Sequence, residues 1–513
     1  MSVLDEYRAT LAGVVIDDSV SMKAAPGVGR SANEGLGDGR VEVASDAAST
    51  AAASATLLDL SLRMDDGDVA SADLVSALLA RAADVNMVEV GWAHTQSSAL
   101  DEARSSDSRR SKGTTRGPLD GIPIGVKDLI DVEGQPTGCG SEHGYPGTAT
   151  ADATCIARLR AAGAVIVGKT TTHEFAFGGT TPPTRNPWNP ERIPGGSSGG
   201  SGAVVGAGWV PVAIGTDTAG SVRIPASYCG TVGFIGSRED VPTSGVATLA
   251  WSLDTVGTLA RSVQDAALVN AVMAGRDARE AIPRPSLPTT VGLPGAVLGP
   301  LDPGVESAFT TALAAMQERG VATIDIDWPD EEVLQAVGFI LMMAESADFH
   351  RQRMTAPEKF DDEVAGLLRL GNQISATDYI RARRVQAHVT EQIMTVFERV
   401  PVIITPTLPC LPAPYGSGTF TPLPLGESLM PLAAAHTRYP LLANIAGLPA
   451  GTVPCGFASG LPVGLQVMGA AGHDEAVLSI MAGIETVLAD AGLWHVGTTS
   501  TGYFDKEGRR DDA

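Results

Sequence analysis

The chain has 513 residues, of which 44% are hydrophobic and 19% are charged, and its formal net charge is −23. This length allows two or three average domains or one large α/β domain, and the apolar fraction is ample for a core. The negative charge argues against nucleic acid or an anionic membrane as the main partner, because both need a basic patch. The basic run at 109–116 is interpreted as a solvated loop.

The cysteines and histidines give no sign of a disulfide framework or a metal site. Five cysteines are scattered without a CxxC pair, and eight histidines show no HExxH spacing. We therefore expect no metal and no cofactor. The sequence shows no signal peptide and no run of 18 apolar residues, which predicts a cytoplasmic location.

The sequence predicts one main domain between two unlike ends. Residues 1–56 form a low-complexity extension, with a short helical stretch at 4–14 followed by a segment rich in Ala, Ser, Gly and Asp. Leucines at helical spacing begin at residue 57. We expect the main domain at 57–500 and a charged tail at 501–513.

Helices and strands alternate along the main domain, which indicates an α/β fold. Apart from those near residue 57, helices are expected at 154–162, 305–317, 332–343, 376–397 and 474–491. Strands are expected within 121–128 and at 164–168, 209–214, 400–404, 450–455 and 465–468. A proline-rich segment at 283–300 predicts an insertion or a subdomain boundary.

The most informative stretch is 195–223, GGSSGGSGAVVGAGWVPVAIGTDTAGSVR, which places serine-bearing loops at both ends of apolar structure. Glycine lets backbone N–H groups approach a ligand closely. Hydroxyls on rigid loops suit nucleophilic acyl transfer, because the developing oxyanion needs N–H donors held in place.

Two other interpretations of the Gly/Ser loop fail. A phosphate-binding loop would end in GK[ST], which is absent here. A nucleophile elbow is suggested by the GxSxG match at 195–199, but that motif needs a strand running directly into the serine. The preceding Pro187, Pro190 and Pro194 exclude a central strand.

Three separated motifs resemble those of the amidase signature family: GIPIGVKD at 121–128, GGSSGGS at 195–201 and GTDTAGSVRIPA at 215–226. Their order and the spacing of the two serines are also similar to the family, and the resemblance covers roughly residues 57–490. It implies the amidase signature fold, in which a large mixed, twisted β-sheet is sandwiched between α-helices.

The resemblance implies that Ser221 is the nucleophile, that Ser197 is a bridging serine after a cis peptide bond, and that Lys127 is the base. Chemistry supports this, because burial would lower a lysine pKa from ~10.4 toward the ~7–8 that a base needs. Without the other motifs, Lys127 would be interpreted as a surface lysine paired with Asp128.

Around the nucleophile, the backbone N–H groups of the loop are expected to form the oxyanion hole, from Thr218, Ala219, Gly220 and Ser221. Ala219 stands where many family members have glycine, and its methyl group narrows the space over this site. Structural support is expected from Ser198, Asp217 and Arg223.

The expected substrate is a small neutral amide or carbamate with an aryl or alkyl portion, cleaved through an acyl-enzyme, with esters as a side activity. The residues expected to line its pocket are Phe175, Phe177, Thr180, Trp251 and Leu341. We expect no nucleic-acid or membrane partner, and a monomer or homodimer.

Two alternatives stay open. One family member supplies ammonia from glutamine to a charged tRNA together with partner subunits, and residues 363–371 resemble a segment of that protein. However, Gly366 and Leu367 stand where an arginine would bind the glutamine carboxylate, and 431–438 lacks an acidic residue for the amino group. The other alternative is a non-catalytic binding protein that retains the fold, although all three triad positions are filled.

Overall fold

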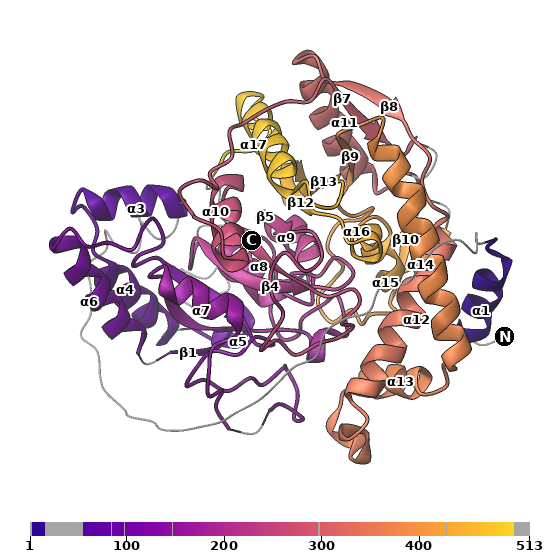
Figure 1. Cartoon of the computed structure of the whole chain (residues 1–513), viewed down its shortest axis with the longest axis horizontal. Coiled ribbons are helices and arrows are strands. Elements are labelled where there is room, and N and C mark those ends of the chain that lie inside the picture. The colour runs from indigo at the N-terminus through magenta and orange to yellow at the C-terminus, as the bar shows by residue number, and fades with distance from the viewer. Residues whose placement is uncertain are drawn as a thin grey trace, which may run out of the picture.

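A mixed β-sheet forms the centre of the protein (Figure 1). The computed structural model describes residues 3–15, 55–83, 85–96, 98–145, 147–295, 298–426 and 428–496. Within these ranges the sheet has 11 strands. In spatial order they are β1 (Trp92–Thr95), β3 (Val165–Thr170), β2 (Pro123–Lys127), β4 (Val212–Asp217), β6 (Thr255–Ala260), β5 (Val232–Ile235), β12 (Ala450–Ala458), β13 (Leu461–Gly469), β9 (Val402–Pro406), β7 (Thr290–Leu293) and β8 (Ala322–Asp325).

The strand directions place several chain segments at one edge of the sheet. β2 pairs in parallel with both β3 and β4, and β7 pairs in parallel with β8 and β9, whereas β4 and β6 are antiparallel. The C-terminal ends of β2 and β4 therefore meet where β6 begins. This edge receives Lys127, Asp217 and Thr255.

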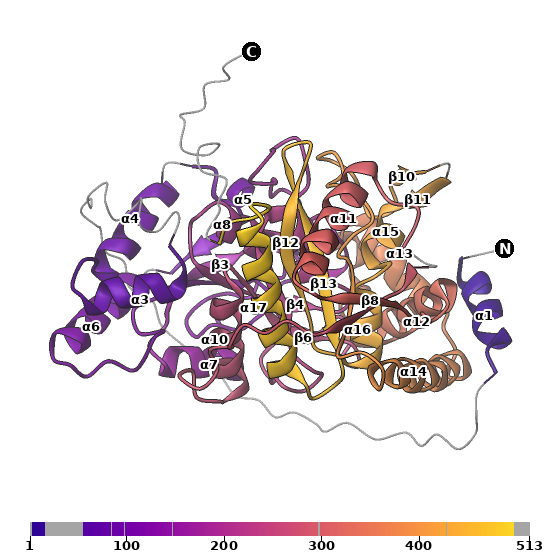
Figure 2. The ribbon, with the colours of Figure 1, turned by 90° about the horizontal axis from the view of Figure 1, so that it is seen from above.

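Helices cover both faces of the sheet, because each strand alternates its apolar side chains between two cores. In β3, Val165 and Val167 face one core and Ile166 faces the other. The core of Ile166 is covered by α3 (Leu57–Asp65), α7 (Thr154–Ala161), α10 (Val263–Ala274), α11 (Pro303–Glu318) and α17 (Asp474–Asp490). Figure 2 shows α10, α11 and α17 together over this face.

The opposite core lies beneath α6 (Ala99–Ser111), α8 (Gly199–Gly206), α9 (Arg223–Cys229), α12 (Glu331–Phe349), α14 (Ala376–Phe397) and α16 (Leu441–Ala446). α4 (Ser71–Ala83) contributes to both cores. The remaining elements are α5 (Met87–Val90), α13 (Asp362–Gly371), α15 (Leu432–Thr437), the 3-10 turns at 174–176, 353–355 and 357–359, and a hairpin of β10 (Pro422–Leu425) and β11 (Ser428–Pro431).

Helix α8 follows the Gly/Ser loop and was not expected, since its sequence GGSGAVVG has low helix propensity. Its glycines are required by close packing. A Cβ atom on Gly200 would lie 2.6 Å from the backbone oxygen of Gly91, and one on Gly202 would lie 2.9 Å from Pro225. Tertiary contacts therefore outweigh the propensity of this segment.

One helix of the extension expected at 1–56 is described, and it coincides with the short helical stretch expected at 4–14. Within the extension 1–56, α1 (Val3–Gly13) buries Leu4 and Leu11 against α12 and α14 (Figure 1), and Arg8 pairs with Asp378 at 2.9 Å. Residues 16–54 and the expected tail at 501–513 lie outside the described residues.

The proline-rich segment 283–300 does not separate two bodies, because it contains β7 of the central sheet. The expected fold, a large mixed sheet between helices, is confirmed. Among the described residues, no helix combines the length and apolar character needed to cross a membrane.

Candidate active site

Lys127 ends β2 and is fully buried. Its Nζ atom lies 2.8 Å from Ser197 Oγ, 2.9 Å from Ser198 Oγ and 2.8 Å from Thr216 Oγ1. Burial lowers the pKa of Lys127 to about 7, although the charges of nearby Asp217 and Asp254 oppose this shift. A lysine with this pKa is partly neutral near pH 7 and can accept a proton.

The two serine loops meet beside this lysine. The Gly196–Ser197 peptide bond is cis, and the Ser198 N–H donates to the backbone oxygen of Ser221 at 3.2 Å. Ser197 is fully buried, whereas Ser221 retains 8% exposure. The structure thus brings Lys127, Ser197 and Ser221 into one region, and Ser221 is the more exposed of the two serines.

Asp217 and Arg223 brace the loop that carries Ser221. Both are fully buried, and Arg223 Nη2 lies 3.0 Å from Asp217 Oδ1. Burial alone would raise the pKa of Asp217, but the Arg223 charge and hydrogen bonds hold it below its usual value. Asp217 also accepts the N–H groups of Gly220 and Val222, at 2.7 and 3.0 Å. The carboxylate therefore fixes the backbone on both sides of Ser221.

These contacts limit which N–H groups can bind an oxyanion. The Gly220 N–H already donates to Asp217. Within the described part of the chain, the N–H groups of Thr218, Ala219 and Ser221 have no acceptor. Gly220 has a φ of +116°, whereas Ala219 has a negative φ, so the alanine fits the loop without strain. We therefore retain Thr218, Ala219 and Ser221 as candidate donors.

A cavity of about 270 Å³ adjoins this site. It reaches the catalytic region through Thr216, which bonds to Lys127, and Thr218 of the nucleophile loop. Its wall combines apolar side chains with threonines and one carboxylate, from Ala176, Thr216, Thr218, Thr243, Val246, Ala247, Thr248, Leu249, Trp251, Asp254, Thr255, Val256 and Phe349. None of these residues is a lysine or an arginine.

Of the five residues expected in the pocket, all of which the structure describes, Trp251 alone lines this cavity. Phe175 and Phe177 pack in the hydrophobic cluster behind it, and the Thr180 backbone lies against Gly196. Leu341 of α12 is fully buried in the core that α12 shares with α14 and α16, and it does not line the cavity.

The sequence did not predict Thr216 as a partner of Lys127. Nor did it predict the cavity-wall residues Thr248, Asp254 and Phe349. Thr216 lies inside the motif at 215–226. Because side chains alternate along a strand, Thr216 and Asp217 were expected to point to opposite faces, and this could have indicated Thr216 as a partner of Lys127. The other three come from segments remote in sequence, and nothing in the sequence alone places them together.

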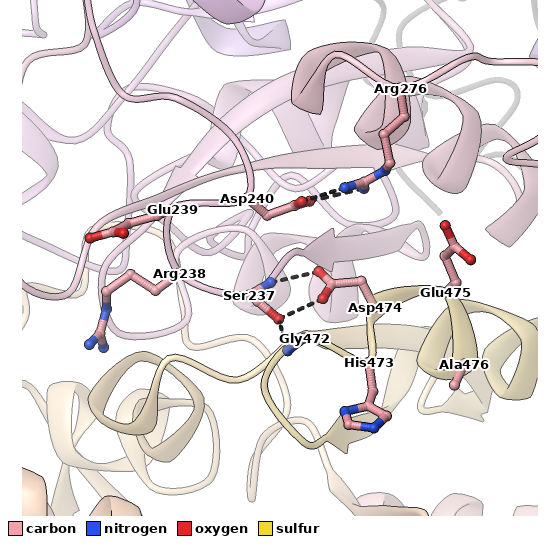
Figure 3. A pocket seen from close by; sticks show the side chains of 10 residues that line it. All are labelled: Ser237, Arg238, Glu239, Asp240, Arg276, Gly472, His473, Asp474, Glu475 and Ala476. Carbon is pink, nitrogen blue, oxygen red and sulfur yellow. Dashed lines mark hydrogen bonds and ion pairs between the residues drawn. The ribbon is translucent and has the colours of Figure 1, made fainter.

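A second hollow, of about 680 Å³, lies beside the start of α17 (Figure 3). Two of its carboxylates are held by other residues of the hollow. Asp240 faces Arg276, and Asp474 accepts hydrogen bonds from the backbone and hydroxyl of Ser237 at 2.7 and 2.6 Å. It contains none of the candidate catalytic residues, so we place the active site at the first cavity.

A buried lysine among serine hydroxyls, a braced nucleophile loop and an adjoining cavity are features suited to amide hydrolysis. The family model described as Amidase matches residues 73–478. The chain therefore belongs to the amidase signature family and is an amide hydrolase.

Individual relatives cover most of the chain. It is 36% identical over 458 residues to a glutamyl-tRNA(Gln) amidotransferase subunit from Roseiflexus castenholzii, and the match spans 81% of this chain and 92% of the relative. It is 39% identical over 378 residues to an amidase of Pseudomonas putida, with a match that spans 71% and 80%. A crystal structure of an amidase superimposes with a TM-score of 0.79 at 31% identity, covering 86% of this chain and 100% of the other.

Proposed function

We propose that the protein hydrolyses small neutral amides or carbamates with an aryl or alkyl portion, using Ser221, Ser197 and Lys127. The observation that carries this proposal is the environment of Lys127. Three hydroxyl oxygens surround its Nζ atom within 2.9 Å. Among the described residues, no carboxylate forms an ion pair with it, so the amine can lose its proton near neutral pH.

In the proposed reaction, Ser221 Oγ attacks the carbonyl carbon and its proton passes through Ser197 to Lys127 Nζ. The C–N bond then breaks, and the amine leaves with the proton returned from Lys127 through Ser197. Water attacks the resulting ester by the same route, which releases the acid and restores the Ser221 hydroxyl. The free N–H groups of the loop stabilise the oxyanion in both steps.

The cavity argues against a substrate that carries a carboxylate. Its wall includes the apolar side chains of Trp251, Phe349 and Leu249 and offers no cation for a carboxylate. Aromatic walls suit an aryl group or a short alkyl chain, because they bury apolar area without demanding a polar partner.

The experiment compares wild type, Ser221→Ala and Ser105→Ala on a panel of p-nitroanilides and aryl carbamates. Ser105 is an exposed serine of α6 and serves as the matched control. We expect colour release by wild type and Ser105→Ala, and none above background by Ser221→Ala. Equal activity of wild type and Ser221→Ala would contradict the assignment of the nucleophile.

Hydrolysis of glutamine is the second candidate function, favoured by the 36% identity to the glutamyl-tRNA(Gln) amidotransferase relative. Against it, Gly366 of α13 faces open space and Leu367 is buried, so neither supplies a cation for the glutamine carboxylate. We expect no ammonia release from glutamine. Release from glutamine without cleavage of any panel member would replace the aryl or alkyl assignment.

A further inference from the structure

Asp254 forms part of the cavity wall and also contacts the loop that carries the nucleophile. We propose that Asp254 is a positioning residue for amide hydrolysis, which joins the nucleophile loop to the cavity wall and supplies the negative charge that stabilises protonated Lys127. The proposal rests on the proposed function in one respect, namely that Ser221 is the nucleophile and Lys127 its base.

The hydrogen bonds of Asp254 connect two separate loops. Its Oδ1 atom accepts from Thr218 Oγ1 at 2.5 Å. Its Oδ2 atom accepts from Thr248 Oγ1 at 2.6 Å and from the N–H groups of Leu249 and Ala250 at 2.9 and 3.1 Å. Burial raises the pKa of the Asp254 carboxyl, and these four hydrogen bonds oppose that shift by favouring the ionised form. The single side chain therefore fixes Thr218, a candidate oxyanion donor, relative to the cavity wall.

Asp254 and Asp217 differ in whether a cation pairs with the carboxylate. Three titratable groups act on Lys127, namely Asp217, Asp254 and Cys139. The Arg223 ion pair compensates Asp217, and burial raises the pKa of the Cys139 thiol, which keeps it neutral. Within the described residues, no cation pairs with Asp254. It is therefore the uncompensated charge of the three.

This charge matters at the step in which Lys127 gains a proton from the serines. Burial disfavours the protonated amine, and a nearby negative charge stabilises it. Removing the charge of Asp254 would make Lys127 a weaker base, while removing its bond to Thr218 would loosen the oxyanion donors. The two contributions are separable, because the first moves a pH midpoint and the second changes the maximal rate.

The test measures the rate at which a fluorophosphonate labels the protein between pH 5 and 9. In this reaction Ser221 Oγ forms a bond to phosphorus, fluoride leaves, and the serine proton passes through Ser197 to Lys127. The probe needs no amide substrate, so it reports on the serine and its base even if the substrate class is wrong. The variants are Asp254→Asn, Thr218→Val and the matched control Asp240→Asn, which lies in the second hollow.

We expect Asp254→Asn to move the midpoint of the acidic limb to lower pH and to reduce the maximal labelling rate about 10- to 100-fold. Thr218→Val should reduce the maximal rate with an unchanged midpoint, because the Asp254 charge remains. Asp240→Asn should match wild type in both measures.

An unchanged midpoint in folded Asp254→Asn would overturn the electrostatic role. A maximal rate within about twofold of wild type for Thr218→Val would overturn the positioning role, and this variant keeps that role testable if Asp254→Asn does not fold. Labelling of wild type but not of Ser221→Ala, without cleavage of any amide, would reject the proposed substrates and leave the role of Asp254 to be judged from the same curves.

Discussion

Two buried lysines lie at the ends of neighbouring strands of the sheet and meet different partners. Lys127 of β2 faces hydroxyls, whereas Lys169 of β3 donates to Asp128 Oδ1 at 2.9 Å and to the Pro136 carbonyl at 3.1 Å. Both are fully buried. Burial alone therefore does not define a base. A carboxylate partner forms an ion pair with the amine, as Asp128 does with Lys169, whereas hydroxyl partners leave the amine of Lys127 without a counter-charge in direct contact.

Strand register explains how the two lysines are kept apart. Lys169 lies opposite Val126, and Lys127 lies opposite Thr170. Because side chains alternate along a strand, the lysines point to opposite faces of the sheet. Asp128, which follows Lys127 in the chain, therefore pairs with Lys169. The alternative interpretation, a surface Lys127 paired with Asp128, is excluded for this geometric reason.

The largest expected effect tests Lys127 as the general base. Replacing Lys127 with Ala should reduce kcat about 10²- to 10⁴-fold on the best panel substrate, because general-base assistance is lost. Circular dichroism should show a folded protein. A kcat within about threefold of wild type would show that Lys127 is not the base.

The ion pair of Lys169 with Asp128 should contribute to the stability of the fold. Lys169→Ala leaves Asp128 buried without its cation, and we expect the free energy of unfolding to fall by about 3–5 kcal/mol. Urea denaturation measures it. The control is Arg104→Ala, whose partner Asp101 is exposed and whose loss should cost less than about 1 kcal/mol. Equal effects of the two variants would contradict the assigned ion pair.

The pH profile sharpens the comparison further. Lys127 must be neutral to act, so kcat/KM should rise about tenfold per pH unit and level off above its pKa, which burial lowers to about 7. Stopped assays at constant ionic strength can resolve this limb. A midpoint near the ordinary range of a carboxyl group, about 4, would point to a different titrating group.

The smallest expected effect concerns the cavity mouth. Trp251 is 49% exposed and lines the cavity. Trp251→Ala should raise KM about tenfold for an aryl amide with little change in kcat, because apolar contact is lost equally in the ground and transition states. Leu341→Ala is the control, since this core residue should affect urea stability and leave KM unchanged. A KM shift in the control alone would reverse the two assignments.

The fold could be predicted from the sequence to the extent that its signals are local. The helix at Ala376–Phe397 agrees with its expected limits, because apolar periodicity and the Ser375 cap are both visible in the chain. The helix at Gly199–Gly206 could not be predicted from its glycines. Nor could strand β7, since proline-rich neighbours suggested a boundary.

The site divides in the same way. The positions of Lys127, Ser197 and Ser221 followed from contiguous motifs, and the structure brings them together. The role proposed for Asp254 depends on hydrogen bonds to Thr218 and Thr248, which no motif joins. Pocket residues were the least predictable, because an apolar side chain gives the same sequence signal in a core and in a cavity wall.

The glycines of α8 have a consequence for how this protein can vary. A Cβ atom on Gly200 or Gly206 would lie within 2.6 Å of backbone atoms of another segment. Even an alanine would therefore force two segments of the chain apart. A saturation library scored for growth or turnover should therefore show a band of intolerant positions along α8, although none of these residues takes part in chemistry. Directed evolution of new specificity will find more freedom around Trp251 than along this helix.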